Sequence, residues 1–430
     1  MTYQIYTLGC KVNEYESEVM ANLLENAGYT KSDNPTICII NTCTVTNSAD
    51  SKSRKLIRSI KRNNPNSVII ATGCFIQNKK DLENLDIDIA LGNKDKSKIV
   101  EYIKNYKQEK IKKIYNINDM EFEDMVLNNA NRTRAYIKIE DGCDNYCTYC
   151  IIPYVRGHVR SKKKEKIIDE AKTLIKNGHK EIVLTGIHTG HYNLANYDLS
   201  DLLRDLCKLK GLERIRLSSI EITELNEKFL ETLKENPKLV NHMHIPLQSG
   251  TNKILKLMNR KYDIEYFKNK IKKIRQLRPN INITTDVIVG FPGETEDDFK
   301  ETINNIKEIN FTKIHVFPYS KREGTKAANM KNQIDGNIKK QRVKKLLEIS
   351  KELELDYMQK HLNKTIDFIP EVYKDGYLIG HSENYLLIKA KGTKNNLKNN
   401  ISVKLTKITY PYIEGKINYW FIIIYMIKLI

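Results

Sequence analysis

Short apolar runs alternate with longer amphipathic stretches over the first 105 residues of the chain. The apolar runs cover residues 5–8, 37–40, 68–71 and 87–91, and helical periodicity covers residues 14–27 and 49–62. Strands that alternate with helices in this way form parallel sheets with helices on their faces. The pattern predicts a small parallel α/β domain over residues 1–105, followed by a polar, aperiodic linker over residues 106–129.

The same alternation returns between residues 130 and 360, where a strand-like run and a helix-length stretch follow one another six times. The predicted strands are residues 135–139, 181–184, 214–217, 242–245, 284–289 and 314–317. A full barrel needs eight such units, so six units predict an open, partial (βα)6 barrel. Its chemistry is expected at the C-terminal ends of the strands.

Residues 361–418 change character, with short strand-like runs at 372–377, 385–389 and 401–405 separated by glycines. This pattern predicts a small all-β barrel. Its nine lysines against five acidic residues suit an RNA-binding appendage, although a solvated barrel face explains them as well. Residues 419–430 are strongly apolar but shorter than the roughly 20 residues that span a bilayer, so no stable membrane insertion is expected. An extra strand, a partner contact and a weak membrane contact stay open for this tail.

The chain has 430 residues and a formal net charge of +19, which indicates several domains and a phosphate-rich partner. Its many Lys, Asn and Ile residues can also follow from genomic base bias, so the charge supports nucleic-acid binding without establishing it. The N-terminus starts directly into a strand and has no secretory pattern. We therefore expect a cytoplasmic protein whose eight cysteines favour metal ligation over disulfides.

Cys143, Cys147 and Cys150 form a C-x3-C-x2-C loop directly after the first predicted barrel strand. Iron sites take soft thiolate ligands, and iron–sulfur clusters are usually held by cysteines alone. Three cysteines leave one iron of a four-iron cluster without a protein ligand, free to bind a small molecule by its amine and carboxylate. A zinc knuckle is the alternative, but structural zinc needs four ligands and no fourth follows at finger spacing.

A second trio of cysteines falls at the ends of strands in the first domain. Cys10, Cys43 and Cys74 each lie just past a predicted strand. Because the C-terminal ends of parallel strands meet at one edge of a sheet, these thiols are expected to converge and to hold a second cluster. The alternative is that each cysteine only suits a tight turn. Cys38 and Cys207 lie within a predicted strand and helix and are expected to be buried apolar residues.

Both trios and their flanks resemble the tRNA methylthiotransferase family along nearly the whole chain. Five motifs carry the resemblance: Thr7-Leu-Gly-Cys-Lys-Val-Asn13, Leu184-Thr-Gly-Ile-His-Thr-Gly190, His244-Ile-Pro-Leu-Gln-Ser-Gly250, Met258-Asn-Arg-Lys-Tyr262 and Gly376-Tyr-Leu-Ile-Gly-His-Ser-Glu-Asn-Tyr385. The resemblance implies an N-terminal methylthiotransferase domain, a radical S-adenosylmethionine (SAM) core and a C-terminal RNA-binding TRAM barrel. The first, second and last motifs look most like the branch that modifies threonylcarbamoyl-adenosine. The apolar tail departs from the family pattern.

The resemblance also implies the cofactors and the reaction. Cys143, Cys147 and Cys150 would hold a [4Fe–4S] cluster that binds SAM, and Cys10, Cys43 and Cys74 would hold an auxiliary [4Fe–4S] cluster that carries sulfur. One SAM would methylate that sulfur, and a second would yield a 5′-deoxyadenosyl radical that activates ring carbon 2 of the adenine beside the anticodon, at position 37 of the tRNA. The partners would be the tRNA anticodon loop, a sulfur source and an electron donor such as flavodoxin or ferredoxin.

Three alternatives stay open. Two are sibling branches that act on isopentenyl-adenosine in tRNA or on an aspartate of a ribosomal protein. The third is a non-catalytic, metal-stabilised RNA-binding protein, which would hold zinc in place of iron.

Further candidate residues lie at the predicted strand ends. SAM contacts are expected from Thr185, Gly186, Gln248, Ser249 and Gly290, although a glycine-rich strand end is often only a tight turn. Glu221 points into the same mouth by its position, with no role assigned.

Several polar and aromatic side chains beside these sites admit two interpretations. Arg156 and Arg160, with the lysines at 162–164, are expected to bind anticodon-loop phosphates or else to form a solvated basic face. His242 and His244 alternate onto one strand face, where packing or hydrogen bonding is favoured over metal ligation. The rings at positions 146, 149 and 154 are candidates for base stacking or for packing of the loop.

Overall fold

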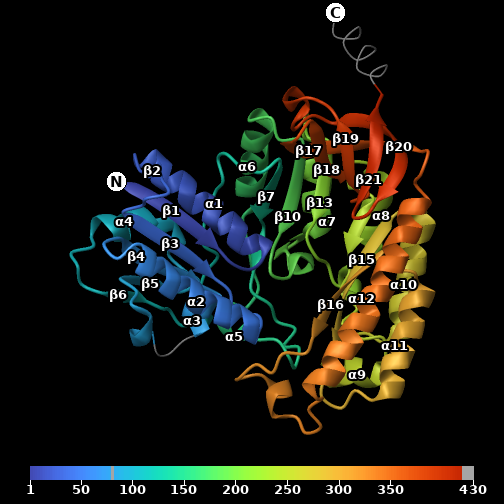
Figure 1. Cartoon of the computed structure of the whole chain (residues 1–430), viewed down its shortest axis with the longest axis horizontal. Coiled ribbons are helices and arrows are strands. Elements are labelled where there is room, and N and C mark those ends of the chain that lie inside the picture. Colours follow the sequence, from blue (N-terminus) through green and yellow to red (C-terminus); the bar gives the residue numbers. More distant parts are fainter. Residues whose placement is uncertain (79–81, 419–430) are drawn as a thin grey trace, which may run out of the picture.

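The structure is a computed structural model that describes residues 1–78 and 82–418. It consists of an N-terminal α/β unit, a central α/β unit and a C-terminal β-barrel (Figure 1). The prediction for the apolar tail at 419–430 lies outside the described residues. No helix of the described chain has the length and apolar character that a membrane crossing requires.

The N-terminal unit is a six-stranded parallel sheet in the order β2-β1-β3-β4-β5-β6. The four predicted strands are present as β1, β3, β4 and β5, and the predicted helices as α1 and α2. Their bounds are β1 Thr2–Thr7, β2 Thr30–Lys31, β3 Ile37–Thr42, β4 Val68–Gly73, β5 Ile89–Leu91, β6 Ile111–Lys113, α1 Lys11–Asn26, α2 Asn47–Asn63, α3 Cys74–Asn78 and α4 Ile99–Lys104.

Two edge strands of this sheet were not predicted. β2 has two residues, and β6 lies inside the stretch 106–129 that was predicted to be a linker. β6 contains two lysines in three residues and therefore shows no apolar pattern, yet it pairs with β5 through the backbone. Backbone pairing at a sheet edge needs no buried side chains, which is why the sequence pattern missed it.

The central unit carries all six predicted strands in two parallel sheets, β13-β10-β7 and β14-β15-β16. A β-bridge between Ile215 and Leu239, and a hydrogen bond from Ile220 N to His244 O, join the two sheets. The prediction of an open, partial (βα)6 barrel is therefore confirmed. The strands are β7 Arg134–Lys138, β10 Glu181–Thr185, β13 Arg214–Leu217, β14 His242–His244, β15 Asn282–Val289 and β16 Lys313–Pro318.

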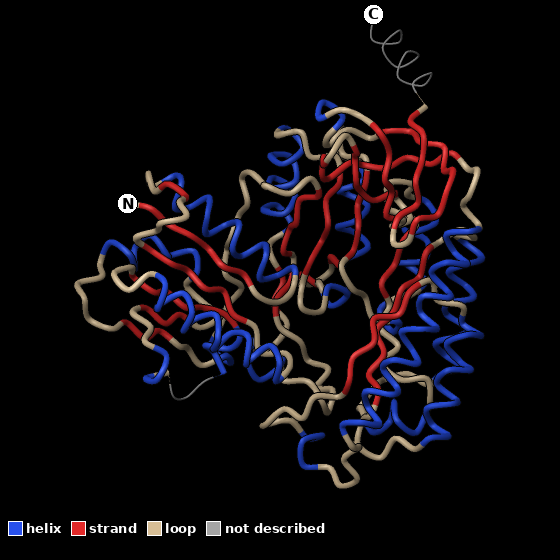
Figure 2. Tube along the Cα trace, viewed as in Figure 1, coloured by secondary structure: helices blue, strands red, loops and turns tan. Residues whose placement is uncertain are grey.

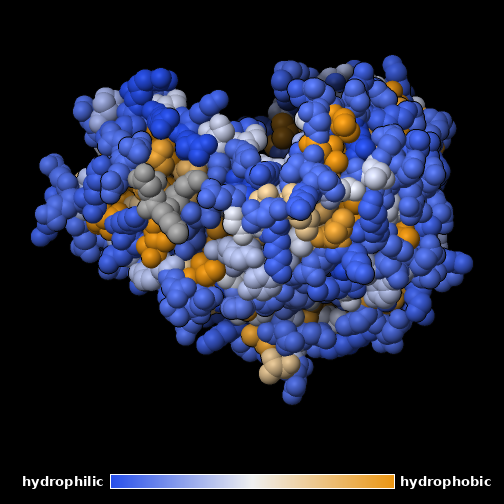
Figure 3. Space-filling view, turned by 90° about the horizontal axis from the view of Figure 1, so that it is seen from below, coloured by the Kyte–Doolittle hydropathy of each residue, from blue (hydrophilic) through white to orange (hydrophobic). Residues whose placement is uncertain are grey.

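Amphipathic helices cover the outside of these strands, as Figure 2 shows most clearly beside β15 and β16. Their buried positions carry Leu, Ile and Phe side chains, whereas the outer faces are charged. The helices of the central unit are α5 Ile152–Arg156, which packs against the N-terminal unit, and α6 Lys164–Lys176, α7 Leu199–Cys207, α8 Glu227–Glu235, α9 Asn252–Leu257, α10 Ile264–Leu277, α11 Glu296–Ile309 and α12 Gly336–Gln359. Figure 3 shows a molecular face covered mainly by hydrophilic residues, with scattered apolar patches.

The C-terminal unit is a closed five-stranded barrel in the order β17-β18-β19-β21-β20, which fits the predicted TRAM barrel. The predicted strand at 372–377 is wrong, because Asp375 and Gly376 have φ values of 52° and 80° and form the turn between two strands. The strands are β17 Thr365–Lys374, β18 Tyr377–Ser382, β19 Leu387–Lys391, β20 Ile401–Thr409 and β21 Tyr412–Ile417.

This barrel covers the N-terminal ends of the central strands. Arg214, the first residue of β13, donates from Nη2 to Asp367 O at 3.1 Å and to Asn400 Oδ1 at 2.7 Å. Asn282, the first residue of β15, donates to Asn384 O at 2.7 Å. The opposite, C-terminal ends of the central strands are therefore left for the chemistry.

Arg214→Met is expected to loosen the C-terminal barrel from the core. The substitution removes charge-assisted hydrogen bonds to two acceptors of the barrel, each worth about 1.5–3 kcal/mol. Hydrogen–deuterium exchange should become faster in β17 and β20, whereas Arg62→Met, which changes an exposed arginine in α2, should leave it unchanged. Unchanged exchange in both variants would show that Arg214 does not fasten the barrel.

Candidate active site

The loop that carries Cys143, Cys147 and Cys150 is fixed at both ends by the backbone. Gly142 has a φ of 95°, and a Cβ there would lie 1.9 Å from His158 O, so only glycine fits. Cys143 N donates to Gly157 O at 3.0 Å, and Thr148 N donates to Met258 O at 3.0 Å. The three thiols are therefore presented on a positioned loop after β7, at the C-terminal mouth of the partial barrel.

The protein around this first trio disfavours the deprotonated, negatively charged form of the thiols when no metal is bound. Burial, together with the neighbouring Cys147 thiol, raises the pKa of Cys150 to about 12. Burial also raises the pKa of Cys143 well above its ordinary value. Arg260 Nη1 lies 3.3 Å from Cys147 Sγ and offers a positive charge. A bound metal would supply the rest of the positive charge that balances the buried thiolates, because a coordinating thiol is deprotonated outright.

The spacing of the sulfur atoms separates a cluster from a single ion. Ligands of one tetrahedral zinc lie about 4 Å apart, given zinc–sulfur bonds of about 2.3 Å. Among the described residues, which include all eight cysteines, the three ligand atoms of neither trio all lie within 4.8 Å of one another. The three thiols of each trio are therefore spaced more widely than the ligands of a single tetrahedral zinc ion.

The second trio meets at the edge of the N-terminal sheet. Cys10 follows β1 and caps α1, Cys43 follows β3, and Cys74 follows β4. A Cβ on Gly9 would lie 3.2 Å from Cys43 Sγ, which brings the first two cysteines of this trio together. Burial, with a contribution from the thiols of Cys74 and Cys10, raises the pKa of Cys43 to about 11. The convergence expected from the parallel strands is present, and ligation by the trio stays a prediction.

The two remaining cysteines differ in burial. Cys38 is fully buried in β3, as predicted. Cys207 lies at the end of α7, half-buried against the central core.

Arg156 lies between the two trios. Its Nε atom donates to Cys74 Sγ at 3.2 Å, and its Nη2 atom donates to Asn13 Oδ1 at 2.8 Å. Its Nη1 atom pairs with Glu16 and with Asp141, both at 3.0 Å. Arg156 belongs to α5, which directly follows the first trio, and Ile151 before this helix and Val155 within it pack against Cys74. The two cysteine sites are therefore neighbours.

The predicted RNA-binding role of Arg156 is wrong, because its side chain is fully buried and neutralised by carboxylates from two domains. Lys162 is also fully buried and pairs with Glu170 at 2.5 Å. Arg160 keeps a half-buried side chain 3.8 Å from Asp141, and its RNA contact stays a prediction. A basic stretch in the sequence does not reveal which of its charges meet buried partners.

A cluster of buried charges surrounds Arg156. Lys138 Nζ lies 2.8 Å from Glu16 and 2.6 Å from Asp141, and Lys96 Nζ lies 2.7 Å from Glu16. Burial opposes the ionisation of the Glu16 and Asp141 carboxyl groups. The surrounding cations outweigh burial and hold the pKa values of both groups well below their ordinary range. Sequence reasoning missed this network, because its members lie far apart in the chain and each resembles a solvated surface charge.

The residues predicted to contact SAM lie after β10, β14 and β15. Thr185 is buried at the end of β10, and a Cβ on Gly186 would lie 2.7 Å from Glu140 Oε2. Gln248 and Gly290 have φ values of 64° and 70°. Ser249 Oγ is buried without a hydrogen-bond partner among the described residues, so a polar ligand atom would satisfy it. SAM binding by these residues stays a prediction.

Glu221 is linked to the first trio through Arg260. Its carboxylate lies 2.6 Å from Arg260 Nη2, and the same guanidinium reaches Cys147 Sγ. Glu221 therefore positions the cation that faces a cysteine of the loop. Sequence reasoning placed this glutamate at the mouth but did not identify Arg260.

A histidine pair beside the first trio was also missed. His188 Nδ1 lies 3.6 Å from Cys143 Sγ, and its Nε2 atom lies 3.1 Å from Glu224. His191 lies 3.4 Å from the same carboxylate. Burial by itself raises the pKa of Glu224, but the two imidazoles outweigh burial and lower this pKa to about 2. In the sequence, the i, i+3 spacing of these two histidines was the feature from which the pair could have been predicted.

The other aromatic and histidine candidates behave as packing groups or stay exposed. His242 and His244 share Thr284 Oγ1, at 3.3 and 2.9 Å, in agreement with the prediction of hydrogen bonding. Tyr149 packs edge-on against Phe291, whereas the rings of residues 146 and 154 are exposed and contact each other edge-to-face.

Comparison with known proteins agrees with this architecture. Residues 137–306 match the radical SAM superfamily, and residues 2–92 match an uncharacterized protein family, UPF0004. The structure of the radical SAM methyltransferase TsrM from Kitasatospora setae, with cobalamin and a [4Fe–4S] cluster bound, superposes with a TM-score of 0.55 at 14% identity. The superposition covers 74% of each chain and shows a shared fold.

Sequence relatives cover almost the whole chain. The threonylcarbamoyladenosine tRNA methylthiotransferases of Bacillus subtilis and Thermotoga maritima are 43% and 39% identical over 96% and 94% of both chains. The tRNA-2-methylthio-N(6)-dimethylallyladenosine synthase of Clostridium tetani is 36% identical over 96% of both chains. The chain therefore belongs to the radical SAM tRNA methylthiotransferase family.

Proposed function

We propose that this enzyme attaches a methylthio group to ring carbon 2 of threonylcarbamoyl-adenosine beside the anticodon of tRNA. The observation that carries the proposal is the 43% identity, over 96% of both chains, with the Bacillus subtilis threonylcarbamoyladenosine enzyme. The relative that acts on dimethylallyladenosine is less similar, at 36% identity. The isopentenyl-adenosine branch is therefore the second candidate.

The radical SAM core implies SAM and one [4Fe–4S] cluster, which Cys143, Cys147 and Cys150 would hold. We infer that Cys10, Cys43 and Cys74 hold a second cluster. When bound, the first cluster supplies the electron that cleaves SAM, and the second supplies the sulfur of the methylthio group. Arg260 and Arg156 each place a positive charge on a cysteine sulfur, and such charge-assisted contacts stabilise thiolate ligands.

The remaining partners follow from this reaction. The substrate base lies in a single-stranded loop, which can be turned into a pocket without breaking a duplex. The C-terminal barrel, with nine lysines against five acidic residues, is proposed to bind the surrounding RNA. An electron donor of the flavodoxin or ferredoxin type and a sulfur source complete the partners, and a cytoplasmic location stays a prediction.

Cys147→Ala and Cys43→Ala should separate the two cysteine sites. Removing a ligand of the first cluster should abolish SAM cleavage, whereas Cys43→Ala should keep SAM cleavage but stop methylthio transfer. Each variant should hold about four irons in place of about eight, from the ligand sets of two cubanes. The assays are iron analysis, 5′-deoxyadenosine formation and nucleoside mass spectrometry, with Cys207→Ala as the control. Equal loss of SAM cleavage in both variants would contradict the division of roles.

Arg156→Met should destabilise the junction between the two sites. It leaves Glu16 and Asp141 buried with less positive charge, and breaking a buried ion pair costs about 3–5 kcal/mol. We expect a lower midpoint of thermal unfolding and iron loss from the second site, with partial recovery in Arg156→Lys. Arg58→Met changes an exposed arginine and serves as the control. Full iron and stability combined with weaker tRNA binding would instead support a phosphate contact.

A further inference from the structure

A cavity of about 280 Å³ lies where all three units of the chain meet. Val183, Leu217 and Thr284 line it from inside the partial barrel, Tyr385 lines it from the C-terminal barrel, and Lys11 lines it from α1. None of the five residues predicted to contact SAM borders it, and neither does Glu221. Pockets for whole drug-sized ligands measure about 300–1,000 Å³, so this cavity suits one substituent of a larger molecule.

Two buried polar groups on the wall of this cavity have unused hydrogen-bonding atoms. Arg216 is 3% exposed, and its Nε atom binds Glu181 at 2.6 Å, but Nη1 has no partner among the described residues. His242 is 7% exposed, and its Nδ1 atom is likewise without a partner. Buried polar atoms are normally hydrogen-bonded to protein or to ordered water, so a polar ligand atom or a water molecule would satisfy both.

Among the described residues, one cation on the wall of the cavity, Lys11, has no carboxylate partner. Four Lys or Arg side chains line it against two carboxylates. Three of the four cations are paired with carboxylates, Lys313 with Glu354 at 3.0 Å, Arg134 with Glu371 at 3.1 Å and Arg216 with Glu181 at 2.6 Å. The ammonium group of Lys11 has no ion pair or hydrogen bond within the described part of the chain. Lys11 and Arg216 Nη1 are therefore available to a carboxylate.

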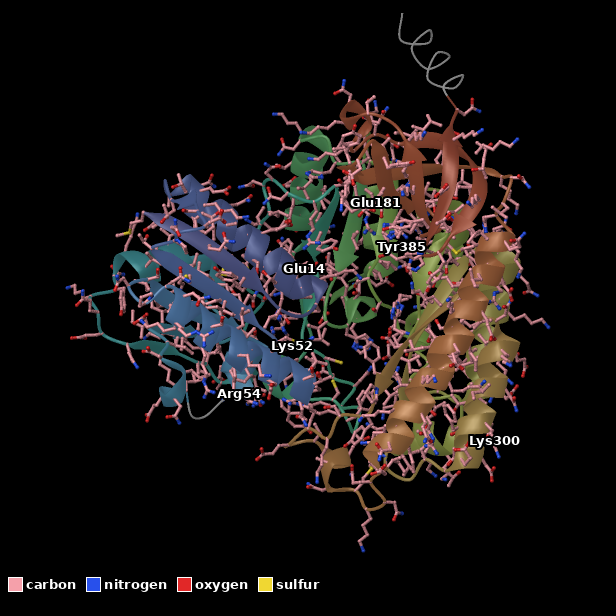
Figure 4. The ribbon with its side chains drawn as sticks, viewed as in Figure 1. Glu14, Lys52, Arg54, Glu181, Lys300 and Tyr385 are labelled. Carbon is pink, nitrogen blue, oxygen red and sulfur yellow. The ribbon has the colours of Figure 1, made fainter. Side chains whose placement is uncertain are left out.

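An aromatic stack holds the Arg216 guanidinium in place. Tyr385 lies between the C-terminal barrel and the core strands, where Figure 4 labels it below Glu181. Its ring stacks on His242 and His381 at centroid distances of 4.5 and 4.4 Å, and the Arg216 guanidinium lies 4.8 Å from its centre. The C-terminal barrel therefore acts as a wall of the cavity in addition to any role in RNA binding.

We propose that Lys11 and Arg216 bind the carboxylate of the threonylcarbamoyl group on the substrate adenine. This inference rests on the proposed function and adds the residues that would distinguish a threonylcarbamoyl base from an isopentenyl base, which has no charge. Lys11, which lines the cavity, directly follows Cys10 of the second cysteine trio in the chain. Ring carbon 2 and the carbon that bears N6 flank the same ring nitrogen, so the substituent must lie beside the reacting carbon.

The test compares substrates before it compares variants. Anaerobically reconstituted full-length enzyme would receive anticodon stem-loop RNAs whose adenine carries threonylcarbamoyl, its neutral carboxamide or an isopentenyl group. Losing a charge-assisted contact to buried donors should lower kcat/KM for the carboxamide about 10- to 100-fold relative to the acid, mainly through KM. This comparison needs no substitution, so misfolding of a variant cannot mimic its result.

Lys11→Met and Arg216→Met should lower kcat/KM for the acid by a similar factor and should reduce the difference between the acid and the carboxamide. Lys11→Met is the more informative variant, because the Lys11 ammonium makes no hydrogen bond or ion pair with the described residues, whereas Arg216 also holds Glu181. Lys272→Met removes an exposed charge on α10 and should preserve both the activity and the preference for the acid.

The outcomes separate this inference from the proposed function. Equal turnover of acid and carboxamide by the unaltered enzyme would overturn the carboxylate site and leave the proposed function intact. Turnover of the isopentenyl RNA alone would overturn both. SAM also carries a carboxylate, so slower SAM cleavage by Lys11→Met without RNA would assign the cavity to SAM and overturn the inference.

Discussion

The arrangement of the site depends on buried charges that join the first two units of the chain. Arg156 reaches Glu16 of the N-terminal unit, Asp141 of the central unit and the sulfur of Cys74 with one guanidinium group. A buried charge is tolerated only when it is paired and hydrogen-bonded, so the network forms only when both units are docked in this orientation. That constraint places two cysteine sites from separate sheets beside each other.

The strands follow from their side chains, which explains how much of the fold could be predicted. The six core strands and four strands of the first sheet were recognisable as apolar runs, and the cysteines fell at their ends. β6 was not recognisable, because an edge strand can pair through its backbone while its side chains are charged. The turn at Asp375 and Gly376 was placed inside a strand, because local apolarity does not show where the chain reverses.

The candidate site was predictable where ligands share a short loop or a repeated position after strands. It was not predictable where a function depends on pairing across domains. Arg156 was assigned to RNA because its neighbours in the sequence are basic, whereas its neighbours in space are acidic. Lys11 and Arg216 gave no signal at all, because the cavity they line exists only after three units assemble.

The central claim is that two iron–sulfur clusters occupy neighbouring sites in one chain. Electron paramagnetic resonance of the fully reduced, reconstituted enzyme tests it most directly, because adjacent paramagnetic clusters split or broaden each other's signals. The account predicts such coupling in the unaltered protein and its loss, with one uncoupled cluster signal remaining, in Cys43→Ala. A single uncoupled cluster signal in the unaltered protein, unchanged by Cys43→Ala, would contradict it.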